Sequence, residues 1–90
     1  MRGVTRLGDL CTGHPGGEPR PSITGSPNVF INNRPAHRVG DAWAVHNGHG
    51  GVLIEGSGRV FVNGQPLGRI GDAISCGSVV AQGSDNVFAA

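Results

Sequence analysis

Residues 25–42 read GSPNVFINNRPAHRVGDA, and residues 56–73 read GSGRVFVNGQPLGRIGDA. The two stretches are identical at ten of eighteen positions, with an offset of 31 residues and no gap. Partial copies lie near both ends of the chain: residues 6–9 repeat the Arg-x-Gly-Asp element, and residues 83–88 repeat the Gly-Ser-x-x-Val-Phe element. The 90-residue chain is therefore predicted to be a single domain, residues 1–90, in which one unit is used three times.

Each unit is predicted to form a β-hairpin. The β-branched and aromatic residues at 29–31 and 60–62 are typical of short strands, and Asn32-Asn33 and Asn63-Gly64 follow them as two-residue turns. No window shows a helical period of apolar residues, so the fold class is predicted to be all-β. Further strands are expected at residues 52–54, 79–81 and 87–88, and a loop rich in Gly and Pro is expected at residues 11–22.

The composition predicts that apolar packing alone does not hold this chain together. Gly and Pro account for 17 and 6 residues, and the aromatic side chains are Trp43, Phe30, Phe61 and Phe88. A chain this short with so few large apolar groups has little core to offset the loss of conformational entropy. A metal ion, a partner or oligomerisation is therefore expected to contribute to stability.

The charge pattern excludes several classes of protein. Seven Arg nearly balance six acidic residues, for a net charge of +1, so the basic excess typical of nucleic-acid binders is missing. No run of 18 apolar residues predicts a membrane span, and no signal peptide is expected at the N-terminus. Two cysteines do not make a disulfide framework, and reduced thiols are expected.

Potential metal ligands follow the three Arg-x-Gly-Asp elements at similar distances. His14 and His46 each lie five residues after the Asp, and Cys76 lies four residues after it. A threefold arrangement of the units would bring these side chains toward one axis. His49 adds a fourth donor, because it stands on the other side of the Asn47-Gly48 turn from His46, in the two-residue spacing typical of structural zinc sites. Three imidazoles and one thiolate suit tetrahedral Zn²⁺, which is expected as one structural ion; iron fits this set less well.

Other residues of these chemical types have simpler interpretations. Cys11 is the rival thiol, although it lies out of phase with the repeat and is readily interpreted as a small buried hydrophobe. His37 stands where the next repeat has Gly68, and is expected to be a solvent-facing turn residue. The repeated aspartates are expected to cap turns and to pair with the arginines of the same elements: Asp9, Asp41 and Asp72 with Arg6, Arg38 and Arg69.

These motifs together resemble those of the PAAR-repeat (Pro-Ala-Ala-Arg) family. Residues 34–41, RPAHRVGD, are similar to its signature with His37 in place of the second Ala, and residues 66–69 form a looser second copy. The His49-Gly50 pair and residues 75–77 are similar too. The resemblance extends from about Leu7 to Phe88.

The resemblance implies a small all-β cone with a zinc ion near its apex, held by His14, His46, His49 and Cys76. It also implies a non-enzymatic tip that caps, through its base, the trimeric spike of a type VI secretion system (a valine-glycine repeat protein) or of a contractile phage tail, and helps to pierce a membrane. Such a tip would be assembled in the bacterial cytoplasm and delivered with the secreted spike or within the virion tail. The segment at residues 11–14 is closer to phage-tail members. No fused effector domain is expected.

Two other functions remain open. The chain could be an adaptor that docks a separate effector through the loop at residues 17–22. It could also be a small zinc hydrolase with Asp41 or Glu55 as general base. The strand edges at residues 29–31, 60–62 and 87–88 are interpreted either as core or as edges that pair with the spike.

Overall fold

The computed structural model describes residues 1–13, 17–46 and 48–90, and the described part contains strands but no helix. No segment of that part could therefore cross a membrane as a helix. The strands form four antiparallel pairs, β1–β8, β2–β3, β4–β5 and β6–β7. Their bounds are β1 Arg2–Gly3, β2 Phe30–Ile31, β3 Arg34–Pro35, β4 Ala42–His46, β5 His49–Val52, β6 Phe61–Val62, β7 Gln65–Pro66 and β8 Phe88–Ala89.

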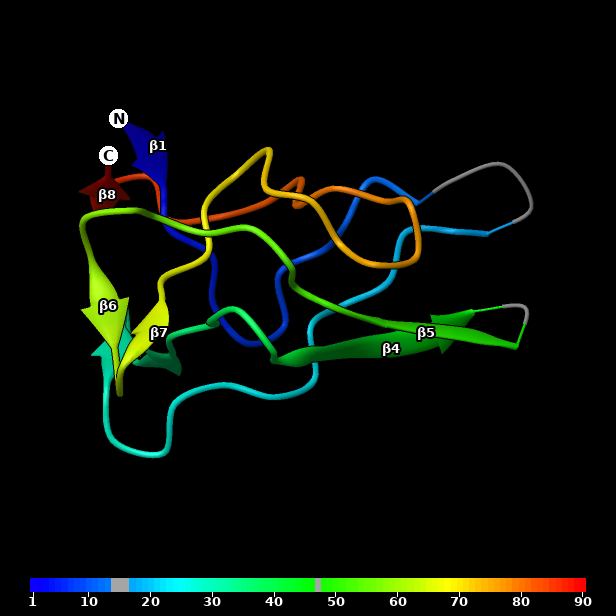
Figure 1. Ribbon diagram of the computed structural model, residues 1–90, viewed down its shortest axis with the longest axis horizontal. Coiled ribbons are helices and arrows are strands. Elements are labelled where there is room, and N and C mark those ends of the chain that lie inside the picture. The colour runs from blue at the N-terminus through cyan, green and yellow to red at the C-terminus, as the bar shows by residue number, and fades with distance from the viewer. Residues whose placement is uncertain (14–16, 47) are drawn as a thin grey trace.

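The molecule has two distinct ends, separated along its longest axis. The three short pairs β1–β8, β2–β3 and β6–β7 gather at one end, together with both termini, and the longer β4–β5 hairpin extends to the other end (Figure 1). The overall dimensions are 32 × 24 × 21 Å. We call the end with the three short pairs the base and the end with the tip of β4–β5 the apex.

A closed ring of backbone hydrogen bonds defines a pseudo-threefold axis between these ends. The Thr5 amide donates to the Gly68 carbonyl at 2.9 Å, the Gly68 amide to the His37 carbonyl at 2.9 Å, and the His37 amide to the Thr5 carbonyl at 3.1 Å. These residues occupy the same place in the three units, so each unit donates to one neighbour and accepts from the other. The three predicted copies therefore surround one axis.

The hairpin turns confirm the predicted turn chemistry. Asn32 and Asn33 have φ of 53° and 66°, and Asn63 and Gly64 have φ of 53° and 79°. Two successive positive φ angles are the signature of the type I′ turn, whose twist matches that of the flanking strands. The remaining unit, which we count as the first because it contains residues 1–9, has no such turn, because its two strands, β1 and β8, come from opposite ends of the chain. The units of residues 25–42 and 56–73 are then the second and the third.

The expected strands at residues 52–54 and 79–81 are only partly formed. Val52 ends β5, whereas Leu53 makes a single bridge to Ile74, and Val79 and Val80 make single bridges to Ala73 and Cys11. Each of these segments passes from one unit to the next. It therefore forms a β-bridge to a neighbouring segment at a single residue and then lies beside a different segment. The sequence analysis missed β4, in which Trp43 is buried and Val45 is exposed.

Two apolar clusters lie along the axis, on either side of the ring. The basal cluster comprises Val4, Ile31, Ala36, Val62, Leu67 and Ala89. The apical cluster comprises Cys11, Trp43, Leu53, Ile74 and Val80, with Val39, Ile70 and Cys76 packed against it. Both clusters are small, and hydrogen-bonded turns and bridges between units add to the packing that they provide.

The Arg-x-Gly-Asp elements form three equivalent turns. In each, the Asp amide donates to the Arg carbonyl, at 3.1, 2.9 and 3.0 Å, and the intervening glycine has φ between 89° and 95°. A positive φ at the third position of a hydrogen-bonded turn is typical of a type II turn and explains the repeated glycine. The predicted capping is confirmed, because one Asp oxygen accepts from the backbone amide of the Arg in every copy.

The Gly-Ser elements form a second set of three equivalent turns. The hydroxyls of Ser26, Ser57 and Ser84 are buried, and each accepts hydrogen bonds from the amides two and three residues later. The glycine before the serine permits a close approach of another chain segment: a Cβ on Gly83 would lie 2.8 Å from the Val4 carbonyl oxygen. The repeat thus preserves backbone contacts between units.

Candidate functional site

The predicted metal ligands are only partly described. His14 lies outside the described residues, and so do the side chains of His46 and His49. The backbones of His46 and His49 pair with each other at the end of the β4–β5 hairpin, and Gly48 between them has φ of 76°. The structure therefore brings two of the four predicted positions together at the apex.

Cys76 lies beside the same hairpin. Its Sγ atom is 3.3 Å from the position that a Cβ on Gly51 would occupy, and Gly51 is two residues after His49 in β5. The neighbouring Ser75 amide donates to the Val52 carbonyl at 2.9 Å, which anchors the Cys76 segment to the end of β5. Cys76 is a partly buried free thiol that packs against the apical cluster.

Cys11 occupies a different environment. It is a member of the apical cluster with only 2% of its surface exposed, and its Sγ atom accepts a hydrogen bond from the Arg20 amide at 3.3 Å. This placement matches the interpretation of Cys11 as a small buried hydrophobe. Within the described ranges, no three His, Cys, Asp or Glu side chains converge as a metal cluster would require.

His37 is not the solvent-facing turn residue that the sequence analysis predicted. Its exposed fraction is 0%, its Nδ1 atom lies 2.9 Å from the Thr24 carbonyl oxygen, and its ring meets that of Trp43 edge to face with centroids 4.9 Å apart. The prediction was wrong because position 37 lies on the axis between two cores. The signal was available: the equivalent residues Thr5 and Gly68 are small and also buried.

The repeated aspartates are held by arginine pairs, as predicted. Asp41 accepts from Arg38 Nε at 2.9 Å and from its terminal nitrogen at 3.1 Å, and also from the Thr24 hydroxyl at 3.0 Å. Burial alone would raise the pKa of Asp41, but these hydrogen bonds outweigh burial and hold the pKa below its usual value. A general base needs a free, readily protonated oxygen, so Asp41 is unsuited to that role.

Glu55, the other candidate base for a zinc hydrolase, is also engaged. Its Oε1 atom accepts from the Ala73 amide at 2.8 Å, and the side chain caps the segment that enters the apical turn of the third unit. Gln82 makes the equivalent bond to the Leu10 amide at 2.9 Å. Glu55 is therefore explained by its place in the repeat.

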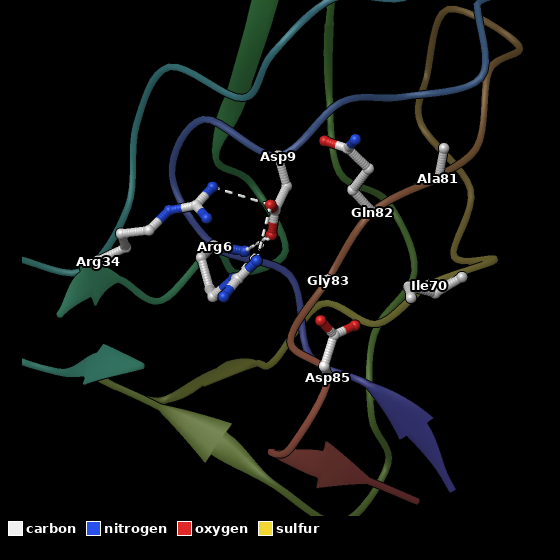
Figure 2. Close-up of a pocket in the computed structure, with 8 residues that line it drawn as sticks. All are labelled: Arg6, Asp9, Arg34, Ile70, Ala81, Gln82, Gly83 and Asp85. Atoms are coloured by element: carbon white, nitrogen blue, oxygen red, sulfur yellow. Dashed lines mark hydrogen bonds and ion pairs between the residues drawn. The ribbon is translucent and has the colours of Figure 1, made fainter. Parts of the chain in front are cut away.

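A surface pocket of about 420 Å³ lies where the first and third units meet (Figure 2). Figure 2 shows the Asp9 carboxylate lying between the guanidinium groups of Arg6 and Arg34, at 3.0 and 2.8 Å. Burial alone would raise the pKa of Asp9, but the hydrogen bonds from Arg6 and the positive charges of Arg34 and Arg6 outweigh burial and lower it. The sequence analysis predicted the Arg6 pair but missed Arg34. Because arginines engage both of its carboxylate oxygens, Asp9 is not a free base.

The base carries three equivalent exposed phenylalanines. Phe30, Phe61 and Phe88 expose 56%, 56% and 52% of their surface, at the first position of β2, β6 and β8. The next residue of each strand is buried in the basal cluster. The core interpretation therefore holds for one side chain of each strand, while the phenylalanine faces outward. Pairing of these edges with a spike stays a prediction.

A comparison with protein-family models agrees with the repeat pattern. The model described as the PAAR motif matches residues 11–82. A search of curated protein sequences found no match. The matched segment includes both complete copies of the repeat and all four predicted metal ligands.

Proposed function

Because the chain belongs to the PAAR-motif family, whose members are spike-tip proteins of contractile injection systems, we propose that it caps and sharpens the trimeric spike of such a machine. The observation that carries this proposal is the ring formed by Thr5, His37 and Gly68, which gives one chain three nearly equivalent faces. A single chain with this symmetry can meet each chain of a trimer with similar contacts.

The base is the proposed docking surface. Phe30, Phe61 and Phe88 stand at equivalent positions around the axis, at the end where the three short strand pairs gather (Figure 1). Full burial of a phenylalanine side chain contributes about 2–3 kcal/mol, so covering three half-exposed rings would contribute several kcal/mol to association. The regular spacing favours a partner that repeats the same apolar pocket three times, which a trimeric spike provides.

The apex is the proposed metal centre. His14, His46, His49 and Cys76 would hold one Zn²⁺ there, with iron as the less suited alternative. The paired backbones of His46 and His49 and the position of the Cys76 thiol beside Gly51 support this assignment. A closed site with four protein ligands is structural, and it would join apical segments that otherwise meet through few backbone bridges.

The remaining parts of the proposal follow from the same role. The tip would be assembled with the spike in a bacterial cytoplasm, would leave with it as part of a secreted spike or of a phage tail, and would contact the target membrane only in passing.

The adaptor alternative assigns effector binding to residues 17–22. Ser22 in that loop is buried, and its hydroxyl donates to the Arg6 carbonyl at 2.8 Å, so an effector would contact the exposed Glu18 and Pro19.

Binding to the purified cognate spike trimer tests the docking surface. We expect the triple variant Phe30→Ser, Phe61→Ser, Phe88→Ser to bind at least tenfold more weakly than the wild type, because it loses the apolar contacts. The matched control is the double variant Ile23→Ser, Ile54→Ser, which removes comparably exposed apolar side chains away from the base strands. Equal loss in both variants, or no binding of the wild type to the trimer, would contradict the proposal.

A further inference from the structure

The backbone of His37 belongs to the axial ring, and its imidazole is buried. Among the described residues, only one of its two nitrogens has a hydrogen-bond partner. Nδ1 donates to the Thr24 carbonyl over 2.9 Å, which fixes the neutral tautomer with the proton on Nδ1. Nε2 is buried and has no hydrogen-bond partner among the described residues. The Trp43 ring covers the imidazole edge to face, with an angle of 69° between the planes.

The position equivalent to His37 in the third unit has no room for a side chain. A Cβ added to Gly68, the equivalent of His37, would lie 2.6 Å from Leu53 Cδ2 and 2.7 Å from Thr5 Cγ2. The third equivalent position carries the small Thr5. The Leu53 and Thr5 side chains therefore fill the space beside Gly68, and among the three equivalent positions only that of the second unit carries a ring.

The same imidazole contacts the root of the β4–β5 hairpin. Trp43 belongs to β4, and the Thr24 hydroxyl accepts a hydrogen bond from the amide of Ala42, the first residue of that strand, at 2.8 Å. His37 thus touches the hairpin through Trp43 and through the Thr24 segment. The other end of this hairpin is formed by His46 and His49.

Within the described part of the chain, no free counter-charge faces the ring from the elements packed around it. Asp41 is bound by Arg38 through both carboxylate oxygens, and Asp9 is bound by Arg6 and Arg34. Burial lowers the pKa of His37 below 6.5, and Arg38 acts in the same direction, against the opposing effects of the Thr24 hydrogen bond, Asp41 and Asp9. A buried imidazolium without a partner is costly, so protonation favours a state in which the ring reaches water.

We propose that His37 is an acid-sensitive latch, whose neutral imidazole holds the β4–β5 hairpin against the axis and whose protonation releases that hairpin. The latch acts within the fold and does not depend on the spike partner. In the closed state the ring binds no proton, and in the open state it behaves as an exposed histidine with a pKa near 6.5.

Opening of the latch becomes more favourable as pH falls, because the open state binds a proton at His37 and the closed state does not. Well above pH 6.5 both states are neutral at position 37, and protonation adds nothing to the opening of the latch. Below pH 6.5 the open state gains a proton that the closed state does not hold. The equilibrium constant for opening then rises about tenfold per pH unit, until pH falls below the lowered pKa of the closed state.

Amide hydrogen exchange on the full chain tests the latch. The reporter is the Ala44 amide in β4, which donates to the Pro21 carbonyl. The control is the amide of Leu67, a residue of the basal cluster, which donates to the Val60 carbonyl. After correction for intrinsic exchange rates, we expect protection at Ala44 to fall about tenfold per pH unit between pH 6.5 and the lowered pKa, and protection at Leu67 to fall less. Parallel loss at both amides would overturn a local latch.

The variant His37→Asn separates this effect from the titration of other histidines. Its side-chain amide can donate to the Thr24 carbonyl but does not titrate, so the steep loss at Ala44 should disappear. The same slope in variant and wild type would overturn the proposal. If the variant does not fold, ¹⁵N spectra of the wild-type imidazoles decide: His37 should remain the neutral Nδ1-protonated form at pH 6, and an imidazolium in the folded protein at that pH would refute the latch.

Discussion

The Thr5 amide donates to the carbonyl of Gly68, 63 residues away in the chain, at a distance of 2.9 Å. This bond closes the ring through His37, and the ring aligns the three units so that their basal strands face one direction. The base can present three phenylalanines to one partner only while this alignment persists. Tight packing at the axis is therefore a condition for the proposed docking.

We predict that Gly68→Ala destabilises the fold by about 1–3 kcal/mol, because its Cβ would overlap Leu53 and Thr5 at 2.6 and 2.7 Å. Gly58→Ala is the control, since its Cβ would meet nothing within 4 Å. Urea unfolding at pH 7.5 measures both. Equal midpoints for the two variants would show that the axis is not tightly packed.

Asp9 should contribute to stability in a pH-dependent way. Its lowered pKa means that this contribution is fully present well above pH 3.8 and is lost as pH falls through the lowered value. We expect Asp9→Asn to cost about 1–3 kcal/mol at pH 7 and to flatten the decline in stability below pH 4, because the neutral amide cannot form the charged pairs.

Asp85→Asn is the matched control for Asp9→Asn. Asp85 lines the same pocket but is exposed (Figure 2), and its replacement should change the free energy of unfolding by less than about 0.5 kcal/mol. Unfolding curves from pH 2.5 to pH 7 compare the three proteins. A larger loss in Asp85→Asn than in Asp9→Asn would contradict the role given to the Asp9 pairs.

In the Arg-x-Gly-Asp turns, the free-energy cost of a positive φ can be measured without a steric clash of the side chain. Gly40 has φ of 95°, and a Cβ there would meet nothing within 4 Å. We therefore expect Gly40→Ala to destabilise the protein by about 1–2 kcal/mol through φ alone. Thermal unfolding beside Gly58→Ala checks this expectation, and an unchanged midpoint in Gly40→Ala would refute the type II turn.

Metal analysis tests the apical assignment. We expect one zinc ion per wild-type chain, loss of zinc in Cys76→Ser, and retention of zinc in Cys11→Ser, because Cys11 is buried in the apical cluster. Removal of zinc by a chelator should lower the unfolding temperature of the wild type. If zinc were retained in Cys76→Ser but lost in Cys11→Ser, the sulfur ligand would be Cys11 and the assignment of Cys76 would be wrong.

The repeat was sufficient to predict the basal half of the fold. Asn63-Gly64 and Asn32-Asn33 adopt the expected turns because their conformations are decided locally, by two residues that tolerate positive φ. The capping of the Arg-x-Gly-Asp turns by their aspartates was predictable for the same reason, because it also depends on residues within one unit. These features need only information from within one unit.

The features that escaped prediction depend on contacts between units. His37 is buried because it is the one large side chain on an axis shared with Thr5 and Gly68, and Arg34 reaches Asp9 of another unit. Hydrophobicity alone did not show that Phe30 faces outward while Ile31 packs inward, because two-residue strands are too short to display an alternating pattern.

Native mass spectrometry of the chain mixed with its cognate spike trimer tests the central claim most directly. A tip with pseudo-threefold symmetry occupies the trimer axis, so the account predicts a complex of one chain with three spike chains, even when the tip is in excess. A complex that binds three tips per trimer, or a trimer that binds none, would contradict it.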